Sequence, residues 1–296
     1  MTILLIGKNG QVGWELQRTL AALAPIVAVD FPEIDLLNSD AIRTLVERTS
    51  PNLIVNAAAY TAVDQAESEA EVAMAINATA PGILAEAAKA RNIPLVHYST
   101  DYVYNGEGTV AYREDNATGP LGVYGQSKLA GDNAIEATGC AHFIFRTSWV
   151  YGMRGKNFLL TMLRLAREKE ELAIVGDQIG APTWSRLIAE VTAFALTRCW
   201  DNTKGDLGLW EKRGVYHLAP SGETSWYGFA EAIFREDPRK EEQVLKQLRS
   251  IKTEDYPTPA KRPANSRLNC NKLQETFGLH LHPWETSLQL AIAEDL

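Results

Sequence analysis

The chain has 296 residues, with 37 Asp and Glu against 29 Lys and Arg, so its formal charge is −8. This length is enough for one large domain or two unequal ones, and the acidic balance disfavours nucleic acid or an anionic membrane as the main partner. Three widely spaced cysteines, Cys140, Cys199 and Cys270, predict neither a disulfide framework nor a zinc site and favour a reducing cytoplasm.

The apolar opening at residues 1–6 meets Gly7 and Lys8 at once, too early for the apolar core of a signal peptide. No later stretch reaches the length of a membrane span. We therefore expect neither export nor insertion in a membrane.

Short aliphatic runs alternate with longer segments of helical spacing, such as 71–90, through the first half of the chain. The expected strands cover residues 2–6, 26–30, 52–56, 94–100 and 141–150. This alternation is typical of βαβ units, so the predicted fold class is α/β, with a Rossmann-like doubly wound parallel sheet.

The second half of the sequence has a different pattern of helices and loops. Amphipathic helices are expected at 157–172 and 184–200, while the segments 176–184 and 256–269 are rich in loop-forming residues. These segments predict a smaller C-terminal portion that shapes a substrate pocket.

Two domains with a soft boundary follow from this pattern. We expect a dinucleotide-binding domain over 1–150, to which the chain returns around 186–217, and a mainly substrate-binding portion over 151–296.

Gly7, Gly10 and Gly13 form a G-x-x-G-x-x-G pattern between the first strand and the first helix. Glycines at this place allow a tight turn and bring backbone N–H groups close to a pyrophosphate at the helix N-terminus. The alternative is a glycine-rich turn without a ligand.

Asp30 ends the second expected strand, at the distance downstream where a carboxylate reaches the adenosine ribose. A carboxylate there favours NAD(H) over NADP(H), although neighbouring bases relax that rule. Asp35 and Leu36 follow at positions suited to frame the adenine. A plain turn-capping role for Asp30 is the alternative.

Tyr124 and Lys128 stand four residues apart in a segment with helical spacing, so they share a helix face. An ammonium near the phenol is expected to lower the pKa of the phenol, which then passes a proton to a carbonyl oxygen as hydride arrives. Thr100, where the fourth strand ends, can donate to the same oxygen. A solvated Tyr–Lys pair and a turn-capping threonine are the alternatives.

The ordered motifs resemble those of the dTDP-4-dehydrorhamnose reductase family, a group of extended short-chain dehydrogenases/reductases. They are GKNGQVGWEL, NAAAYTAVDQAE, HYSTDYVY, VYGQSKLAG, FRTSWVYG and DQIGAPT, followed by YHLAPSGETSWYGFA and TPAKRPANSRLN. The resemblance implies reduction of the C4 keto group of dTDP-4-dehydro-β-L-rhamnose by NADPH or NADH, with a dTDP-sugar as the partner and a monomer or homodimer in the cytoplasm.

The resemblance also implies residue roles. Tyr124 is the proton donor, Lys128 orients the nicotinamide ribose and Thr100 holds the keto oxygen. The implied cofactor contacts are Gly10, Gln11, Val12, Asp30, Asp35, Leu36, Ala59, Tyr60, Thr61 and Tyr98. The implied substrate contacts are Asp101 and Trp149, with Asn157 and Arg262 at the nucleotide-diphosphate end as weaker candidates.

Related sugar-nucleotide dehydratases carry an acid directly after the Thr-Asp pair, where this chain has Tyr102, which disfavours dehydration. Some members of the family hold a divalent cation such as Mg²⁺ between subunits through carboxylates. Glu15 and Glu190 are available here, yet a helix-surface role is the preferred interpretation of both, so no metal site is assigned.

Two other functions stay open at this stage. The same machinery would suit a reductase of another 4-keto deoxysugar nucleotide. The regulatory β subunit of methionine adenosyltransferase shares the fold without catalysing this reaction, so a non-catalytic binding module is the second alternative.

Overall fold

The computed structural model describes residues 1–201 and 206–293. Residues 202–205 belong to the predicted return segment 186–217, and residues 294–296 end the predicted substrate-binding portion; both lie outside the described residues. Among the described residues, no helix combines the length and the apolar character needed to cross a membrane.

The centre of the molecule is a parallel sheet with the strand order β12-β5-β4-β3-β1-β2. Its strands are β1 (Ile3–Ile6), β2 (Ile26–Val29), β3 (Leu53–Asn56), β4 (Leu95–Thr100), β5 (His142–Thr147) and β12 (Gly214–His217). The chain doubles back at β1, which pairs with both β2 and β3, so the carboxyl ends of β1 and β3 flank the usual ligand crevice. The predicted fold class is confirmed.

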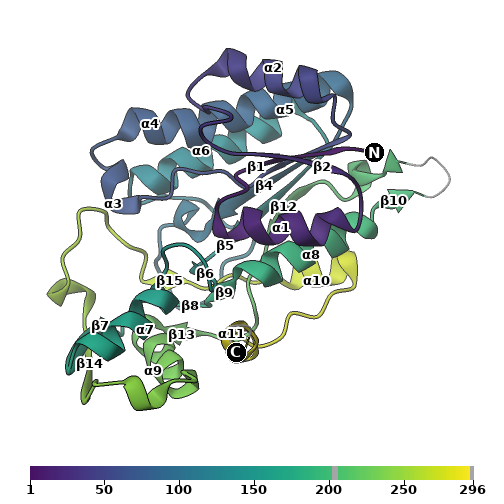
Figure 1. Ribbon diagram of the computed structural model, residues 1–296. Helices are drawn as coiled ribbons and strands as arrows, with labels where there is room; N and C mark the ends of the chain where they lie inside the picture. The colour runs from purple at the N-terminus through teal and green to yellow at the C-terminus, as the bar shows by residue number, and fades with distance from the viewer. Residues whose placement is uncertain (202–205, 294–296) are drawn as a thin grey trace.

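Helices cover both faces of this sheet (Figure 1). On one face lie α1 (Gln11–Ala21), α8 (Ser185–Thr197) and α10 (Asn271–Phe277), and on the other α2 (Ser39–Thr49), α5 (Ala80–Arg91) and α6 (Val123–Thr138). Side chains alternate along β1, so Ile3 and Leu5 join one apolar core while Leu4 and Ile6 join the other. Both cores hold the strand ends, and hence the site, in fixed positions.

Shorter elements complete the chain, several of them in a lobe beyond the carboxyl edge of the sheet (Figure 1). They are β6 (Val150–Tyr151), α7 (Phe158–Glu168), β7 (Glu171–Val175), β8 (Ile179–Gly180), β9 (Thr183–Trp184), β10 (Trp200–Asp201), β11 (Asp206–Leu207), β13 (Thr224–Ser225), α9 (Trp226–Glu236), β14 (Gln247–Ile251), β15 (Asn265–Ser266) and α11 (Trp284–Ala293). Small sheets pair β14 with β7, β6 with β9, and β8 with both β13 and β15.

Two predicted helices differ in the structure. The segment 71–90 divides into α4 (Ala70–Met74), a π-helical turn (Ala75–Thr79) and α5, after the short α3 (Val63–Ala66). The π turn carries the Asn77 carbonyl so close to α6 that a Cβ on Gly131 would overlap it. The predicted helix 157–172 ends at Glu168, because Lys169 is extended and the following residues pair with β14 as β7.

Candidate active site

The glycine loop joins β1 to α1 in a conformation that needs its glycines. Gly7 has φ +90°, and a Cβ there would come within 2.5 Å of the Ala58 nitrogen. A Cβ on Gly13 would overlap the Gly7 carbonyl oxygen, whereas the nearest atom to a Cβ on Gly10 is 3.5 Å away. No side chain of the described residues caps the start of α1. The amides of Gln11 and Val12 are therefore available to an anion at this helix end.

Asp30 directly follows β2 and holds the glycine loop. Its carboxylate accepts the backbone N–H of Asn9 at 2.8 Å and that of Phe31 at 2.8 Å. This is the capping role that the sequence offered as the alternative, and it also fixes the carboxylate beside the loop. Further on, Asp35 accepts the Leu37 N–H at 2.9 Å, and Leu36 packs against a core.

The loop after β3 carries Ala59, Tyr60 and Thr61. Both backbone groups of Tyr60 bond the Asn77 side chain, its N–H at 2.8 Å and its carbonyl at 3.0 Å. Asn77 also donates to the Ser127 hydroxyl at 3.0 Å, so it ties this loop to α6. Sequence reasoning missed Asn77, whose only signal is a polar residue inside an apolar helical pattern.

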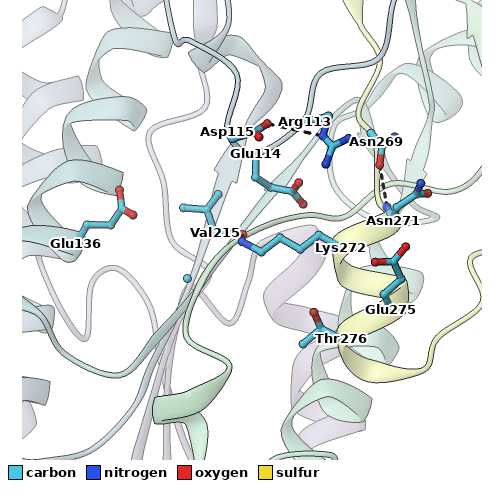
Figure 2. A pocket seen from close by; sticks show the side chains of 11 residues that line it. Arg113, Glu114, Asp115, Glu136, Val215, Asn269, Asn271, Lys272, Glu275 and Thr276 are labelled. Carbon is cyan, nitrogen blue, oxygen red and sulfur yellow. Dashed lines mark hydrogen bonds and ion pairs between the residues drawn. The ribbon is translucent and has the colours of Figure 1, made fainter.

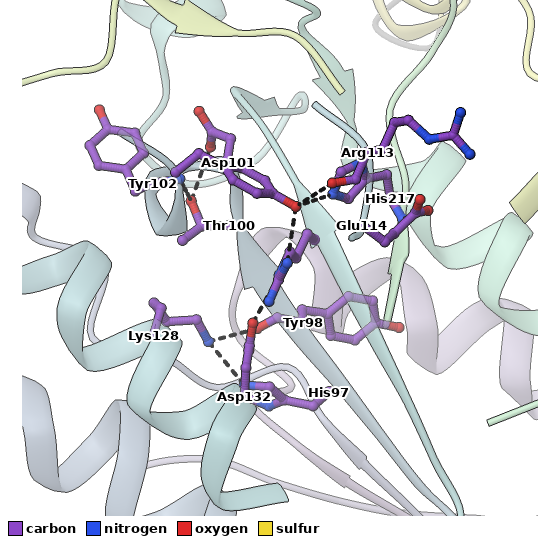
Figure 3. Close-up of polar contacts among 12 residues, drawn as sticks. His97, Tyr98, Thr100, Asp101, Tyr102, Arg113, Glu114, Lys128, Asp132 and His217 are labelled. Atoms are coloured by element: carbon purple, nitrogen blue, oxygen red, sulfur yellow. Dashed lines mark hydrogen bonds and ion pairs between the residues drawn. The ribbon is translucent and has the colours of Figure 1, made fainter. Parts of the chain in front are cut away.

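Thr100 and Asp101 lie where β4 ends (Figure 3), and the Tyr124 phenol is a neighbour of both side chains. The Thr100 hydroxyl donates to Asp101 at 3.0 Å and accepts the Tyr102 N–H at 3.2 Å. Burial raises the pKa of the Tyr124 phenol, and Thr100 partly opposes this as a hydrogen-bonding neighbour. The structure thus brings together the hydroxyl and the phenol that the sequence predicted to act on one oxygen.

Lys128 differs from the expectation. Its ammonium position lies 2.6 Å from the Tyr98 carbonyl and 3.0 Å from His97 Nε2, rather than against the phenol (Figure 3). The pKa of Tyr124 is consequently raised, not lowered, because burial dominates and Lys128 is absent from its principal neighbours among the described residues. The two side chains do share a face of α6 as predicted, one turn apart.

Tyr98, implied as a cofactor contact, points its ring away from Lys128. Its hydroxyl bonds Thr192 on α8 at 2.8 Å, and the side chain belongs to the core between sheet and helix. Only its carbonyl faces the Lys128 side chain. The Tyr98 ring is therefore turned into the core, and Tyr98 can influence a cofactor only by holding Lys128 through its carbonyl.

Trp149 and Asn157 follow β5 in the chain and contact elements of both halves of the molecule. Trp149 has φ +49° and its ring stacks on Trp226 with centroids 3.7 Å apart. Asn157 caps α7 by accepting the Leu160 N–H at 3.1 Å and donates to Gln11 of the glycine loop at 2.9 Å. This places Asn157 beside the cofactor loop, as well as at the start of a helix.

Arg262 crosses from the C-terminal segment to the first half of the chain. It pairs with Asp64 of α3 at 2.7 Å and reaches the Tyr102 hydroxyl at 3.4 Å. The Tyr102 ring in turn packs edge-on against Tyr124, with centroids 5.5 Å apart. Arg262 is therefore not an isolated surface arginine. It contacts Tyr102, which in turn contacts Tyr124.

Several buried polar atoms near these strand ends have no hydrogen-bond partner among the described residues, namely Asp101 Oδ2, Thr147 Oγ1 and Ser266 Oγ. The Ser266 hydroxyl lies close enough to lower the pKa of Asp101 without meeting it in hydrogen-bond geometry. Burial is the larger influence and raises that pKa to about 6. Unpaired groups of this kind are costly without a ligand and suit a hydroxylated one.

The acids considered for a cation lie on helix surfaces. Glu15 on α1 pairs with Arg186 at 3.3 Å, and Glu190 on α8 is exposed. Within residues 1–201 and 206–293, no three His, Cys, Asp or Glu side chains gather as a metal site requires. The sequence assigned no metal site to this chain, and that assignment stays a prediction.

A polar pocket of about 640 Å³ lies elsewhere, between the β12 edge and α10 (Figure 2). Arg113, Glu114 and Lys272 line it, and Lys272 donates to the Val215 carbonyl at 2.7 Å. None of the sequence-predicted site residues lines this pocket. This pocket therefore lies apart from the candidate site at the carboxyl edge of the sheet.

A doubly wound sheet with a glycine loop after its first strand, and with Thr100, Tyr124 and Lys128 at its carboxyl edge, defines a dinucleotide-dependent short-chain dehydrogenase/reductase. A family model described as the RmlD substrate binding domain matches residues 1–296. The chain belongs to this family, that of the dTDP-4-dehydrorhamnose reductases.

Relatives of this name resemble the chain over nearly its full length. The dTDP-4-dehydrorhamnose reductase of Escherichia coli (strain K12) is 47% identical over 300 residues, covering 99% of this chain and 98% of that protein. The one from Burkholderia thailandensis is 46% identical over 298 residues, covering 99% of each.

Two solved structures of the same name superpose closely. The Clostridium acetobutylicum reductase has a TM-score of 0.90 at 34% identity, and the Bacillus anthracis reductase in complex with NADP has 0.88 at 33%. Each comparison covers 99% of both chains.

Proposed function

We propose that this chain reduces the C4 keto group of dTDP-4-dehydro-β-L-rhamnose to dTDP-L-rhamnose with NADPH or NADH. The observation that carries the proposal is the meeting of Thr100 and Tyr124 at the end of β4, with Lys128 on the same helix face as the phenol. Relatives 46% and 47% identical are named for this reaction.

The residues at the glycine loop fit a dinucleotide. The uncapped amides of Gln11 and Val12 offer hydrogen bonds to a pyrophosphate, and the open space at Gly10 lets it approach. Asp30 bonds the loop at Asn9 and would reach the adenosine ribose, while Lys128, which bonds the Tyr98 carbonyl, would contact the nicotinamide ribose. The reduced nicotinamide supplies the hydride.

Tyr124 supplies the proton. Because burial keeps the phenol protonated, it is ready to donate to the alkoxide oxygen that develops at C4 of the sugar. Thr100 donates a second hydrogen bond to the same oxygen, which places the keto group between the two hydroxyls. Lys128 as an ammonium then favours the phenolate left behind, since an opposite charge stabilises it.

The remaining groups are suited to the sugar nucleotide. Asp101 Oδ2 and Thr147 Oγ1 are buried polar atoms without a protein partner among the described residues, so sugar hydroxyls would satisfy them. The Trp149–Trp226 stack offers an apolar wall, and Arg262 is a phosphate partner once it turns from Asp64. Tyr102 occupies the place of the dehydratase acid, which supports reduction without loss of water.

The test follows oxidation of NADPH or NADH by purified protein with dTDP-4-dehydrorhamnose, and product analysis for dTDP-L-rhamnose. Consumption of one reduced cofactor per product supports the proposal. A folded protein that binds the cofactor without consuming it would favour the non-catalytic binding module. A much larger kcat/KM with a different 4-keto sugar nucleotide would favour the other reductase.

The three cysteines, Cys140, Cys199 and Cys270, are free and buried, which supports the reducing cytoplasm as the place of the reaction. The domain boundaries and the state as monomer or homodimer stay predictions. Sedimentation analysis would decide the latter.

A further inference from the structure

A line of buried polar groups connects the loop after β3 with Lys128. The Ala58 N–H donates to Asn56 Oδ1 at 3.2 Å, Asn56 Nδ2 faces His97 Nδ1 at 3.2 Å, and His97 Nε2 faces Lys128 Nζ at 3.0 Å. Asn56 is 1%, His97 0% and Lys128 1% exposed, so water does not substitute for these contacts. Figure 3 shows the last link beside the Lys128–Tyr98 contact.

The donors and acceptors along this line fix its direction. A backbone N–H can only donate, so Asn56 turns its oxygen to Ala58 and its amide nitrogen to His97. His97 Nδ1 must then accept, and a neutral imidazole carries its hydrogen on Nε2, which points at Lys128. An ammonium has no lone pair to accept that hydrogen, whereas a free amine does.

We propose that Asn56 and His97 are positioning residues that favour the free amine of Lys128 in the cofactor-free protein at mildly alkaline pH, and that cofactor binding there is coupled to uptake of up to one proton. This inference rests on the proposed function, in which Lys128 acts as an ammonium. When the cofactor binds, the proton on His97 Nε2 passes to Lys128 Nζ, and one proton from solvent is taken up at His97 Nδ1. Asn56 rotates to accept from Nδ1, which releases the Ala58 N–H.

The surroundings of Lys128 agree with an easily lost proton. Burial lowers the pKa of Lys128 to about 8, against the opposing influence of Asp132 one turn along α6. Asp132 is itself paired with Arg146 of β5 at 3.0 Å, which offsets its charge. On β4, burial is the largest influence that holds the pKa of His97 well below its ordinary value, so the imidazole is neutral even beside an uncharged Lys128.

The amine keeps its other contacts. It still donates to the Tyr98 carbonyl, and its second hydrogen is free for the cofactor ribose. Negative pyrophosphate and the new ribose contact favour the ammonium, so cofactor binding raises the fraction of Lys128 that carries the charge. The chain thereby links occupation of the cleft to the charge that the phenol later needs.

Calorimetric titration of the full chain with NADH, in buffers of different ionisation enthalpy, counts the protons taken up. NADH is used because it lacks the 2′-phosphate, which titrates near neutrality. If the pKa of Lys128 rises from about 8 to the ordinary lysine value, about 0.7 proton enters per site at pH 8.5. By the same linkage, NADH binds roughly tenfold more weakly at pH 9 than at pH 7.

Two variants test the line itself. Asn56→Asp accepts from both Ala58 and a His97 Nδ1–H, and His97→Gln turns an amide oxygen to Lys128 without adding charge, so each allows the ammonium in the free protein. Both are expected to reduce the uptake at pH 8.5 to less than half the wild-type count. Lys128→Met provides the background from every other group, which is subtracted.

The wild-type count decides the inference even if a variant fails to fold. If the wild-type protein binds NADH at pH 8.5 but takes up less than about 0.2 proton per site after the Lys128→Met background is subtracted, the inference is overturned. Full uptake in a folded Asn56→Asp or His97→Gln would overturn the part played by these residues. Since no sugar nucleotide is present, a missing reductase activity is a separate result that leaves the proton count readable.

Discussion

At the scale of single residues, burial raises the pKa of the acid groups of the site. Burial raises the pKa of Tyr124, and burial also raises the pKa of Asp101, to about 6. A neutral phenol is a suitable proton donor at pH 7, and the cationic charge on Lys128 is needed only once the proton has left. The phenol therefore does not need the lowered pKa that its spacing from Lys128 had predicted.

Tyr124→Phe removes the transferable proton and little volume. We expect NADH binding to remain near that of the wild type, while kcat falls by about 10²-fold or more, the scale of general acid catalysis. Stopped-flow turnover beside equilibrium NADH titration measures both quantities. Near-normal turnover would remove Tyr124 from the mechanism, and Tyr102→Phe is the matched control on the neighbouring ring.

Asp101→Asn tests the strain stored at the end of β4. Because the pKa of Asp101 is raised in the folded protein, its contribution to stability is full below the unfolded value near 4 and is lost as the pH rises through about 6. The variant is therefore expected to be more stable than the wild type at pH 8, by up to about 3 kcal/mol, and nearly equal at pH 4. Its KM for the sugar nucleotide should rise.

Urea unfolding at the two pH values measures the Asp101 effect. A variant that is less stable than the wild type at pH 8 would show that the carboxylate is held by favourable contacts instead.

At the scale of elements, strands and helix faces follow from local pattern, while partners across elements do not. The five expected strands of the first half appear within two residues except the last, where β5 ends at Thr147 and β6 follows, and the helix that bears Tyr124 and Lys128 forms over Val123–Thr138. The glycine spacing likewise predicts the β1–α1 turn. These features depend on neighbours in sequence, which periodicity reports directly.

The missed features depend on residues far apart in sequence. His97 meets Lys128 only because α6 packs against β4, and Asn77 meets Tyr60 only through a π turn against α6. No local pattern encodes either contact. The direction of the Lys128 side chain was therefore beyond what its spacing from Tyr124 could predict.

Two glycines of the β1–α1 turn should respond differently to alanine. In Gly13→Ala the new methyl overlaps the Gly7 carbonyl oxygen, so we expect a loss of about 1–3 kcal/mol in stability. In Gly10→Ala the nearest atom is 3.5 Å away, so stability is kept while the methyl obstructs the pyrophosphate. Its NADH affinity should fall roughly 10- to 100-fold.

Thermal unfolding and NADH titration of both glycine variants separate these effects. Equal losses of stability would contradict the packing difference, and unchanged NADH affinity in Gly10→Ala would contradict a cofactor at this turn.

At the scale of the whole molecule, distant segments meet at one edge of the sheet. Asn157 reaches the glycine loop at Gln11, and Arg262 reaches α3 at Asp64, so both halves of the chain contribute to the same edge of the sheet. The loop-forming composition of residues 256–269 had indicated a segment that shapes a pocket, and Arg262 in this segment lies beside Tyr102. Composition could not predict which residues these side chains contact, such as Gln11 for Asn157 and Asp64 for Arg262.

Arg262→Ala tests whether this crossing contact serves the substrate. Because the Asp64–Arg262 pair is partly exposed, its removal should change stability by no more than about 1 kcal/mol. If Arg262 turns to the diphosphate, KM for the sugar nucleotide rises by roughly tenfold or more while NADH affinity is unchanged. Asp64→Asn, which frees the guanidinium without removing it, is the control and should not raise KM. An unchanged KM in Arg262→Ala would restrict this arginine to a structural role.

The most direct measurement on the central claim is the fate of C4 when the protein is given deuterium-labelled reduced cofactor and dTDP-4-dehydrorhamnose. The account predicts dTDP-L-rhamnose with deuterium at C4, formed by the wild type and about 10²-fold more slowly by Tyr124→Phe. A sugar nucleotide recovered unreduced and unlabelled from folded, cofactor-bound protein would contradict it.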